Sequence, residues 1–163
     1  MTKLNIHDEI VSILLELCKG YKVYSKSYPG RKRRLAFAIP RPGKPISKQY
    51  EPNVIAEWRR GKYKDIYEVW HSESEGEAVL DILYPALHKA QNKEIKYLII
   101  VCTGYNLGKE EAKDLVNLLL NNLRDKEGES LFRSDEVLVT EIPEKIQADR
   151  LKMKEYLKQE LKF

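Results

Sequence analysis

Apolar residues recur along the chain with helical spacing in some segments and strand spacing in others. Helical spacing predicts helices over residues 5–18, 74–91 and 110–123, and a charged final helix from Pro143 to about Leu161. Asn5 is placed to cap the first helix, and Pro85 is expected to kink or split the second. Alternating or continuous apolar runs predict strands over residues 21–25, 96–102 and 136–142.

The central stretch, residues 50–72, reads as a β-hairpin. Residues 53–58 and 65–70 are rich in β-branched and aromatic side chains, and they flank a turn over residues 59–62 that contains Gly61. The complete order is helix, strand, hairpin, helix, strand, helix, strand, helix. This order predicts an α/β fold, with a mixed central sheet flanked by helices on both faces. We expect residues 1–163 to form a single domain.

Charge is distributed unevenly over this predicted fold. Residues 19–64 hold fourteen Lys and Arg against two Glu, a net charge of +12, so the remainder of the +4 chain carries −8. Residues 26–49 form a basic connection rich in Pro and Gly, with a short strand expected at residues 35–39. Connections of this length are usually functional or disordered.

A basic segment that also holds five tyrosines is typical of proteins that bind a phosphate backbone, although a solvated basic face is the plainer alternative. The residues predicted to contact nucleic acid are Arg31, Lys32, Arg33, Arg34, Arg41, Lys44, Lys48, Arg59, Arg60 and Lys62.

Cysteine content and the length of the apolar runs narrow the classes of protein to which the chain could belong. Cys18 and Cys102 lie in apolar runs, which predicts buried free thiols rather than a disulfide framework, and no CxxC zinc motif occurs. The apolar runs are too short to span a bilayer, and no signal peptide is recognised, so a cytoplasmic protein without a membrane partner is expected. The abundance of Lys, Glu and Ile is typical of proteins from thermophilic organisms.

Familiar catalytic motifs are absent or incomplete. The segment from Gly104 to Glu110 follows a strand and opens a helix, but its glycine spacing is one residue short of a phosphate-binding loop. Glu110 also stands where Ser or Thr would hold magnesium. Neither cysteine has a polar setting and no GxSxG occurs, so nucleophilic catalysis has no support. The histidines show no ligand spacing, although His71 directly follows the hairpin.

One set of polar residues follows the predicted elements in a recognisable order. Glu9 lies on the first helix, Pro52-Asn53 opens one hairpin strand, and Glu68-Val69-Trp70 ends the other. This arrangement, over about residues 5–102, resembles the PD-(D/E)xK nuclease superfamily, and especially its archaeal Holliday-junction-resolvase-like branch. The resemblance implies a restriction-endonuclease-like core, with catalytic positions at Glu9, Asn53, Glu68 and Trp70.

Two departures from that pattern bear on activity. Asn53 replaces the family's aspartate and removes one full charge from a hard-cation site. Trp70 replaces the lysine, and an indole carries no charge to stabilise the attacking water. A weak Mg²⁺ or Mn²⁺ site would then draw on Glu9, Asn53, Glu68 and Glu57, with Lys64 or Lys89 as conceivable replacement lysines. Each of these residues also has an ordinary structural interpretation.

The leading interpretation is therefore a nucleic-acid-binding protein, DNA being favoured over RNA, with a nuclease-like fold and a degraded metal site. The first alternative is an active Mg²⁺- or Mn²⁺-dependent phosphodiesterase, with His71 or a relocated lysine serving the water. The second is a protein-interaction or assembly subunit, which could form a homodimer through the apolar stripe of a terminal helix.

Overall fold

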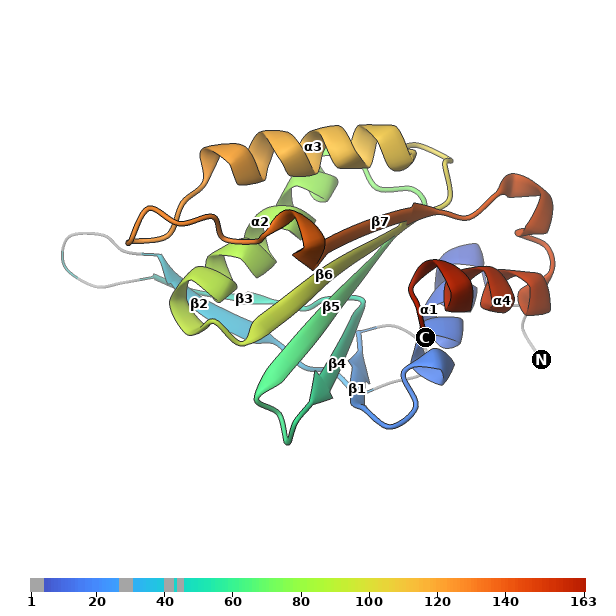
Figure 1. The fold of residues 1–163 in the computed structure, drawn as a ribbon, viewed down its shortest axis with the longest axis horizontal. Helices are drawn as coiled ribbons and strands as arrows, with labels where there is room; N and C mark the ends of the chain where they lie inside the picture. Colours follow the sequence, from blue (N-terminus) through green and yellow to red (C-terminus); the bar gives the residue numbers. More distant parts are fainter. Residues whose placement is uncertain (1–4, 27–30, 40–42, 44–45) are drawn as a thin grey trace.

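The computed structural model describes residues 5–26, 31–39, 43 and 46–163. Its centre is a five-stranded mixed sheet of order β1–β4–β5–β6–β7, flanked by four helices (Figure 1). The fold class expected from the sequence, a mixed α/β sheet with helices on both faces, is thus confirmed. The elements are α1 (Ile6–Leu17), β1 (Lys22–Ser25), β2 (Leu35–Ile39), β3 (Ile46–Tyr50), β4 (Val54–Trp58), β5 (Tyr63–Trp70), α2 (Glu75–Asn92), β6 (Ile95–Cys102), α3 (Lys109–Asn122), β7 (Val137–Glu141) and α4 (Arg150–Glu160).

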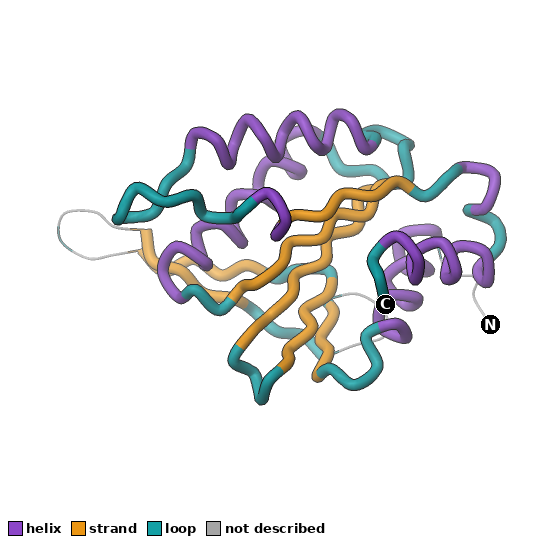
Figure 2. The backbone as a smooth tube through the Cα atoms, in the orientation of Figure 1, coloured by secondary structure: helices purple, strands orange, loops and turns teal. Residues whose placement is uncertain are grey.

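The sheet combines an antiparallel half and a parallel half. β1, β4 and β5 pair antiparallel, whereas β5, β6 and β7 pair parallel through the crossover helices α2 and α3. The two crossovers advance in the same direction across the sheet, so a common handedness places both helices on one face. α1 and α4 cover the other face, as the tube in Figure 2 also shows.

Alternation along β5 divides the interior into two apolar cores. Ile66 and Trp70 point towards α2 and α3, while Tyr67 and Val69 point towards α1 and α4. Cys18 and Cys102 are free and buried, as expected, and burial raises the pKa of each thiol to about 12. No helix in the described part of the chain has the length and apolar character needed to cross a membrane.

Several local expectations are confirmed. The Asn5 side chain caps α1 by accepting the Asp8 backbone N–H at 2.8 Å. The hairpin forms with its turn at residues 59–62, although β5 begins two residues earlier than predicted. Arg59 and Arg60 have φ values of 50° and 58°, and Gly61 follows with φ 83°. Residues other than Gly rarely adopt this left-handed conformation, because Cβ then crowds the backbone.

Three expectations need correction. The sequence predicts that residues 46–49 belong to the long basic connection and that Tyr50 opens the central stretch. Residues 46–50 instead form β3, which pairs antiparallel with β2 along its whole length. Pro85 does not split α2, which continues unbroken through it to Asn92. Pro143 does not start the last helix: a 3₁₀ turn at Glu144–Ile146 comes first, and α4 begins after its cap Asp149.

The β2–β3 hairpin, called the arm below, is held against α2 by side chains. The Gln91 amide accepts the Ala38 N–H at 2.8 Å and donates back to the Ala38 carbonyl. His88 contacts the Ala36 carbonyl through Nδ1 at 2.8 Å. The ring of Phe37 packs on Tyr84 of α2, with centroids 5.5 Å apart. The arm is therefore attached to the domain by directional bonds as well as by apolar contacts.

Candidate functional site

Asn53 and Glu68, two of the predicted catalytic residues, lie at the same end of the β4–β5 hairpin. Val54 pairs with Tyr67, so Asn53 and Glu68 stand at the next opposed position. Asn53 is 2% exposed, and its Oδ1 accepts the Val69 backbone N–H at 2.9 Å. The amide thereby extends the hydrogen bonding of the hairpin beyond the last paired residue, which is an ordinary structural role.

Glu68 is a buried carboxyl group with one oxygen engaged. Oε1 accepts a hydrogen bond from the Tyr50 hydroxyl, while Oε2 has no hydrogen-bond partner in the described part of the chain. The side chain is 1% exposed. Burial, followed by the charge of Asp81, raises the pKa of Glu68 well above its ordinary value. A carboxyl group in this setting is favoured in its neutral form.

Trp70, at the position of the family's lysine, belongs to the core and also orients an acid. It is 1% exposed, and its indole N–H donates to Asp81 Oδ2 at 3.0 Å. Burial raises the pKa of Asp81 to about 6, although the charge of Lys26 and the Trp70 hydrogen bond act in the opposite direction. Asp81 lines a surface hollow of about 230 Å³, together with Lys26, Tyr50, Glu73 and others.

The other two predicted metal ligands lie away from Glu68. Glu9 is on α1, which covers the opposite face of the sheet, and it pairs with Arg150 of α4 at 2.7 Å. Glu57 is near the far end of β4, opposite Lys64 in the ladder, and forms an ion pair with Arg33. No group of three or more His, Cys, Asp or Glu in the described ranges is arranged to hold a metal ion. The predicted set of four is therefore not brought together.

The residues considered as replacements for the lysine have other partners. Lys64 is 2% exposed and pairs with Glu94 at 2.9 Å, and Lys89 pairs with Glu136 at 3.4 Å. His71 Nδ1 lies 2.8 Å from the hydroxyl of Thr103, at the carboxyl ends of β5 and β6. Lys64 and Lys89 thus lie near the carboxyl end of α2, whereas His71 lies beyond the opposite end of β5.

Among the predicted basic residues, those of the Arg31–Arg34 segment are linked to the β4–β5 hairpin by an ion pair. Arg31, Lys32 and Arg34 are exposed on the segment that leads into the arm, and Arg31 accepts the Ser25 N–H through its carbonyl. Arg33 is half-buried over the ring of Tyr24, and its ion pair with Glu57 joins this segment to the β4–β5 hairpin. Lys48 is exposed on β3. Arg41 and Lys44 lie outside the described residues.

The hairpin turn adds cations that rest on aromatic rings. Trp58 and Tyr63 face each other across the turn, with ring centroids 4.8 Å apart. Arg59 lies over both rings, at 5.3 Å and 5.6 Å from their centroids, and Lys62 lies over Tyr63 at 5.4 Å. Arg59, Arg60 and Lys62 are all exposed. We refer to this turn together with the Arg31–Arg34 segment as the basic strip.

Sequence reasoning did not find Tyr50, Asp81 or Lys26, the side chains that surround Glu68. Asp81 carried a usable signal, because it adjoins Ile82 and Ala78 on the apolar stripe of α2, where a lone acid requires a partner. Tyr50 and Lys26 carried none. Lys26 is predicted to lie in the basic connection and Tyr50 at the start of the central stretch, and neither position indicates a contact near Glu68.

No protein-family model, curated protein or solved structure matches this chain.

Proposed function

We propose that this protein binds nucleic acid, DNA in preference to RNA, through the basic strip. The observation that carries the proposal is the physical connection of two separate basic segments by the Arg33–Glu57 ion pair. Six exposed cations, at Arg31, Lys32, Arg34, Arg59, Arg60 and Lys62, lie on the two segments that this ion pair joins. A phosphate backbone is the extended polyanion that such a surface suits.

The aromatic pair in the turn supports the same proposal. Trp58 and Tyr63 are partly exposed beneath Arg59, and stacked aromatic and guanidinium groups are a common platform for nucleic-acid bases. The turn also holds Arg59 and Arg60 in a conformation that disfavours them, although Asn or Gly would fit there without strain. Two arginines in such positions are consistent with selection for ligand contact rather than for stability.

Cleavage by the mechanism of the PD-(D/E)xK superfamily is not part of the proposal. Asn53 and Trp70 depart from the motif, and both have structural bonds that account for their presence. The order α1, β1, β4–β5, α2 and β6, with the β2–β3 arm inserted after β1, supports a nuclease-like scaffold used for binding.

The test is fluorescence anisotropy with labelled single-stranded, duplex and four-way-junction DNA, and with RNA, over a range of salt concentrations. Binding through phosphates predicts that log K falls linearly with log salt concentration, by about 0.9 per contact on duplex DNA. The triple variant Arg31→Ala/Lys32→Ala/Arg34→Ala should bind more weakly and show a shallower salt dependence. Arg33 is left intact because its loss would leave Glu57 buried without its counter-ion.

A matched control removes three exposed lysines from other surfaces, Lys113 on α3 and Lys152 and Lys158 on α4. Equal weakening by both triple variants would mean that only net charge matters, and it would refute the basic strip as the site. Cleavage in Mg²⁺ or Mn²⁺ that is lost with EDTA and in Glu68→Gln would establish the metal-dependent nuclease instead. No binding to any of these nucleic acids would favour the interaction-subunit alternative.

A further inference from the structure

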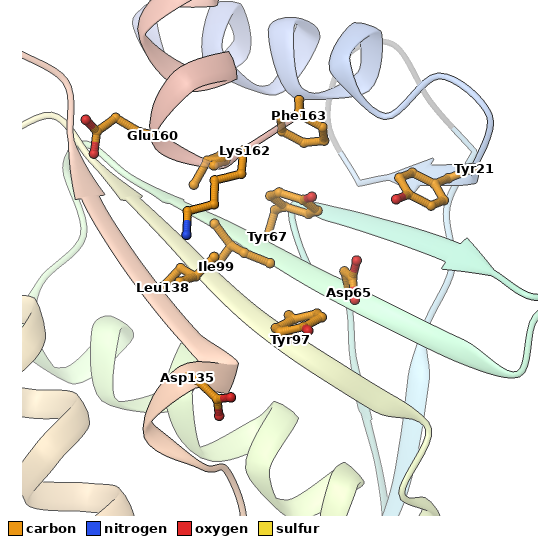
Figure 3. A pocket seen from close by; sticks show the side chains of 11 residues that line it. Tyr21, Asp65, Tyr67, Tyr97, Ile99, Asp135, Leu138, Glu160, Lys162 and Phe163 are labelled. Carbon is orange, nitrogen blue, oxygen red and sulfur yellow. The ribbon is translucent and has the colours of Figure 1, made fainter.

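A cavity lies on the sheet face opposite α2 and α3, away from the acid and lysine residues discussed above. It is formed between the chain that follows α4 and the strands β5, β6 and β7 (Figure 3). Its volume is about 340 Å³, within the range of small-molecule sites. The apolar floor includes Ile99, which is 2% exposed.

Aromatic rings form much of the cavity wall. Tyr67 and Tyr97 rise from neighbouring strands, Tyr21 stands beside them, and Phe163 closes the opposite side. The rings of Tyr67 and Phe163 are nearly parallel, with an interplanar angle of 15° and centroids 6.4 Å apart. Ring faces carry partial negative charge, so several faces around one cavity attract a cation.

An acid, Asp65, stands among these rings. Its side chain lies between Tyr21, Tyr67 and Tyr97 in Figure 3, and the residue is 8% exposed. It accepts the Trp58 indole N–H at 3.1 Å, and no cationic side chain of the described residues forms an ion pair with it. Burial raises the pKa of Asp65 to about 6, opposed by hydrogen bonds from the Trp58 indole and the Tyr97 backbone. A carboxylate kept here at neutral pH lacks a counter-ion.

The rim reinforces the preference for positive charge. Asp135 and Glu160 are exposed there, and among the described lining residues Lys162 supplies the only cation. Figure 3 shows the Lys162 side chain extending towards Leu138 rather than towards Asp65. The lining thus has a net charge of −2 in a chain whose net charge is +4. This polarity is opposite to that of the basic strip, although Asp65 accepts the indole N–H of Trp58 from the strip's hairpin turn.

We propose that this cavity binds a small organic compound with a quaternary ammonium group. The ammonium would lie against Tyr67, Tyr97 and Phe163, with Asp65 supplying the neutralising charge. A ring wall with one buried carboxylate suits an alkylated ammonium better than a metal ion, which needs several oxygen ligands, and the acids of the described residues are not grouped to hold a metal. It also excludes phosphate-bearing ligands, which Asp65 would repel.

The experiment is an NMR titration of the full chain with choline, compared with 3,3-dimethyl-1-butanol, which has the same shape without the charge. Choline should shift the resonances of Tyr67, Tyr97 and Asp65 and bind at least tenfold more tightly than the alcohol. Asp65→Asn should weaken choline binding about tenfold. Lys162→Asn should strengthen choline binding, because it removes a positive charge that repels the ammonium. Asparagine is chosen because it tolerates the positive φ of 57° at this position.

Two further variants keep the test interpretable. Phe163→Leu removes an exposed ring from the rim and should weaken choline binding without changing the fold, while Asp114→Asn on the outer side of α3 should have no effect. Equal binding of choline and the alcohol would show an apolar hollow only. Unchanged choline affinity in both Asp65→Asn and Phe163→Leu would place any binding elsewhere. Either result would overturn the proposal without affecting the nucleic-acid test.

Discussion

Asp65→Asn should stabilise the protein at neutral pH, because the wild-type carboxylate is held in a buried position. The pKa of this group is raised from 3.8 to about 6, chiefly by burial. For an acid with a raised pKa in the folded state, the unfolded chain loses its proton first as pH rises. The stabilisation that the protonated Asp65 gives the folded state is therefore complete below pH 3.8, falls between pH 4 and 6, and is lost at higher pH.

The magnitude follows from the size of the shift. Moving the pKa from 3.8 to about 6 corresponds to roughly 3 kcal/mol between the two protonation states at pH 7.5. Asparagine resembles the neutral acid in shape, and its carbonyl oxygen can still accept the Trp58 indole N–H. We therefore expect Asp65→Asn to raise the free energy of unfolding by about 2–3 kcal/mol at pH 7.5 and to leave it nearly unchanged at pH 4.

Urea unfolding followed by tryptophan fluorescence, at pH 4, 5, 6 and 7.5, measures this directly. Asp114→Asn makes the same charge change at an exposed position and should alter stability by less than about 0.5 kcal/mol at every pH. If Asp65→Asn destabilises the protein at pH 7.5, or if its gain is equal at pH 4 and pH 7.5, the carboxylate is not held at an energetic cost and the reasoning is wrong.

Three further substitutions test other features. Arg60→Gly should raise the free energy of unfolding, measured in urea, by about 0.5–1 kcal/mol, because glycine adopts the left-handed conformation without strain. The same variant should bind DNA more weakly because a cation is lost. A variant less stable than wild type would show that Arg60 is not strained. Trp70→Phe should lower the free energy of unfolding by about 1–3 kcal/mol, because the buried Asp81 carboxyl loses its hydrogen bond from the indole. An unchanged stability in thermal unfolding would argue against the Trp70–Asp81 hydrogen bond. Arg150→Met should lower the free energy of unfolding by about 1 kcal/mol through loss of the ion pair with Glu9. Because that ion pair is partly exposed, the difference in stability from wild type should shrink in 1 M salt. A difference that does not depend on salt would point to lost packing instead.

The main helices and the central hairpin could be predicted because their signals are local. Apolar periodicity identified α1 and α3, and β-branched and aromatic runs identified β4 and β5. β3 escaped prediction because Ile46–Tyr50 follows Pro45 and contains mostly polar residues. Its strand conformation depends on pairing with β2 and on the support of α2, neither of which is visible in a five-residue window.

The candidate site was less predictable, because a side chain's partner depends on tertiary structure. Glu9 and Glu68 follow a nuclease-like order in the sequence, yet α1 packs on the face of the sheet opposite Glu68, and Glu9 is paired with a residue 141 positions away. The cavity around Asp65 was also hidden. Its walls come from five segments between Tyr21 and Phe163, none of which contains a recognisable ligand motif.

The attachment of the arm to α2 has a consequence for self-association. The outer edge of β2 would otherwise expose backbone donors and acceptors to which another strand could pair. Gln91 satisfies both backbone groups of Ala38, and His88 occupies the carbonyl of Ala36, so side chains take the place of a neighbouring strand. The helix thus protects this edge from intermolecular β-pairing, and Gln91→Ala would expose it without removing any apolar contact from the core.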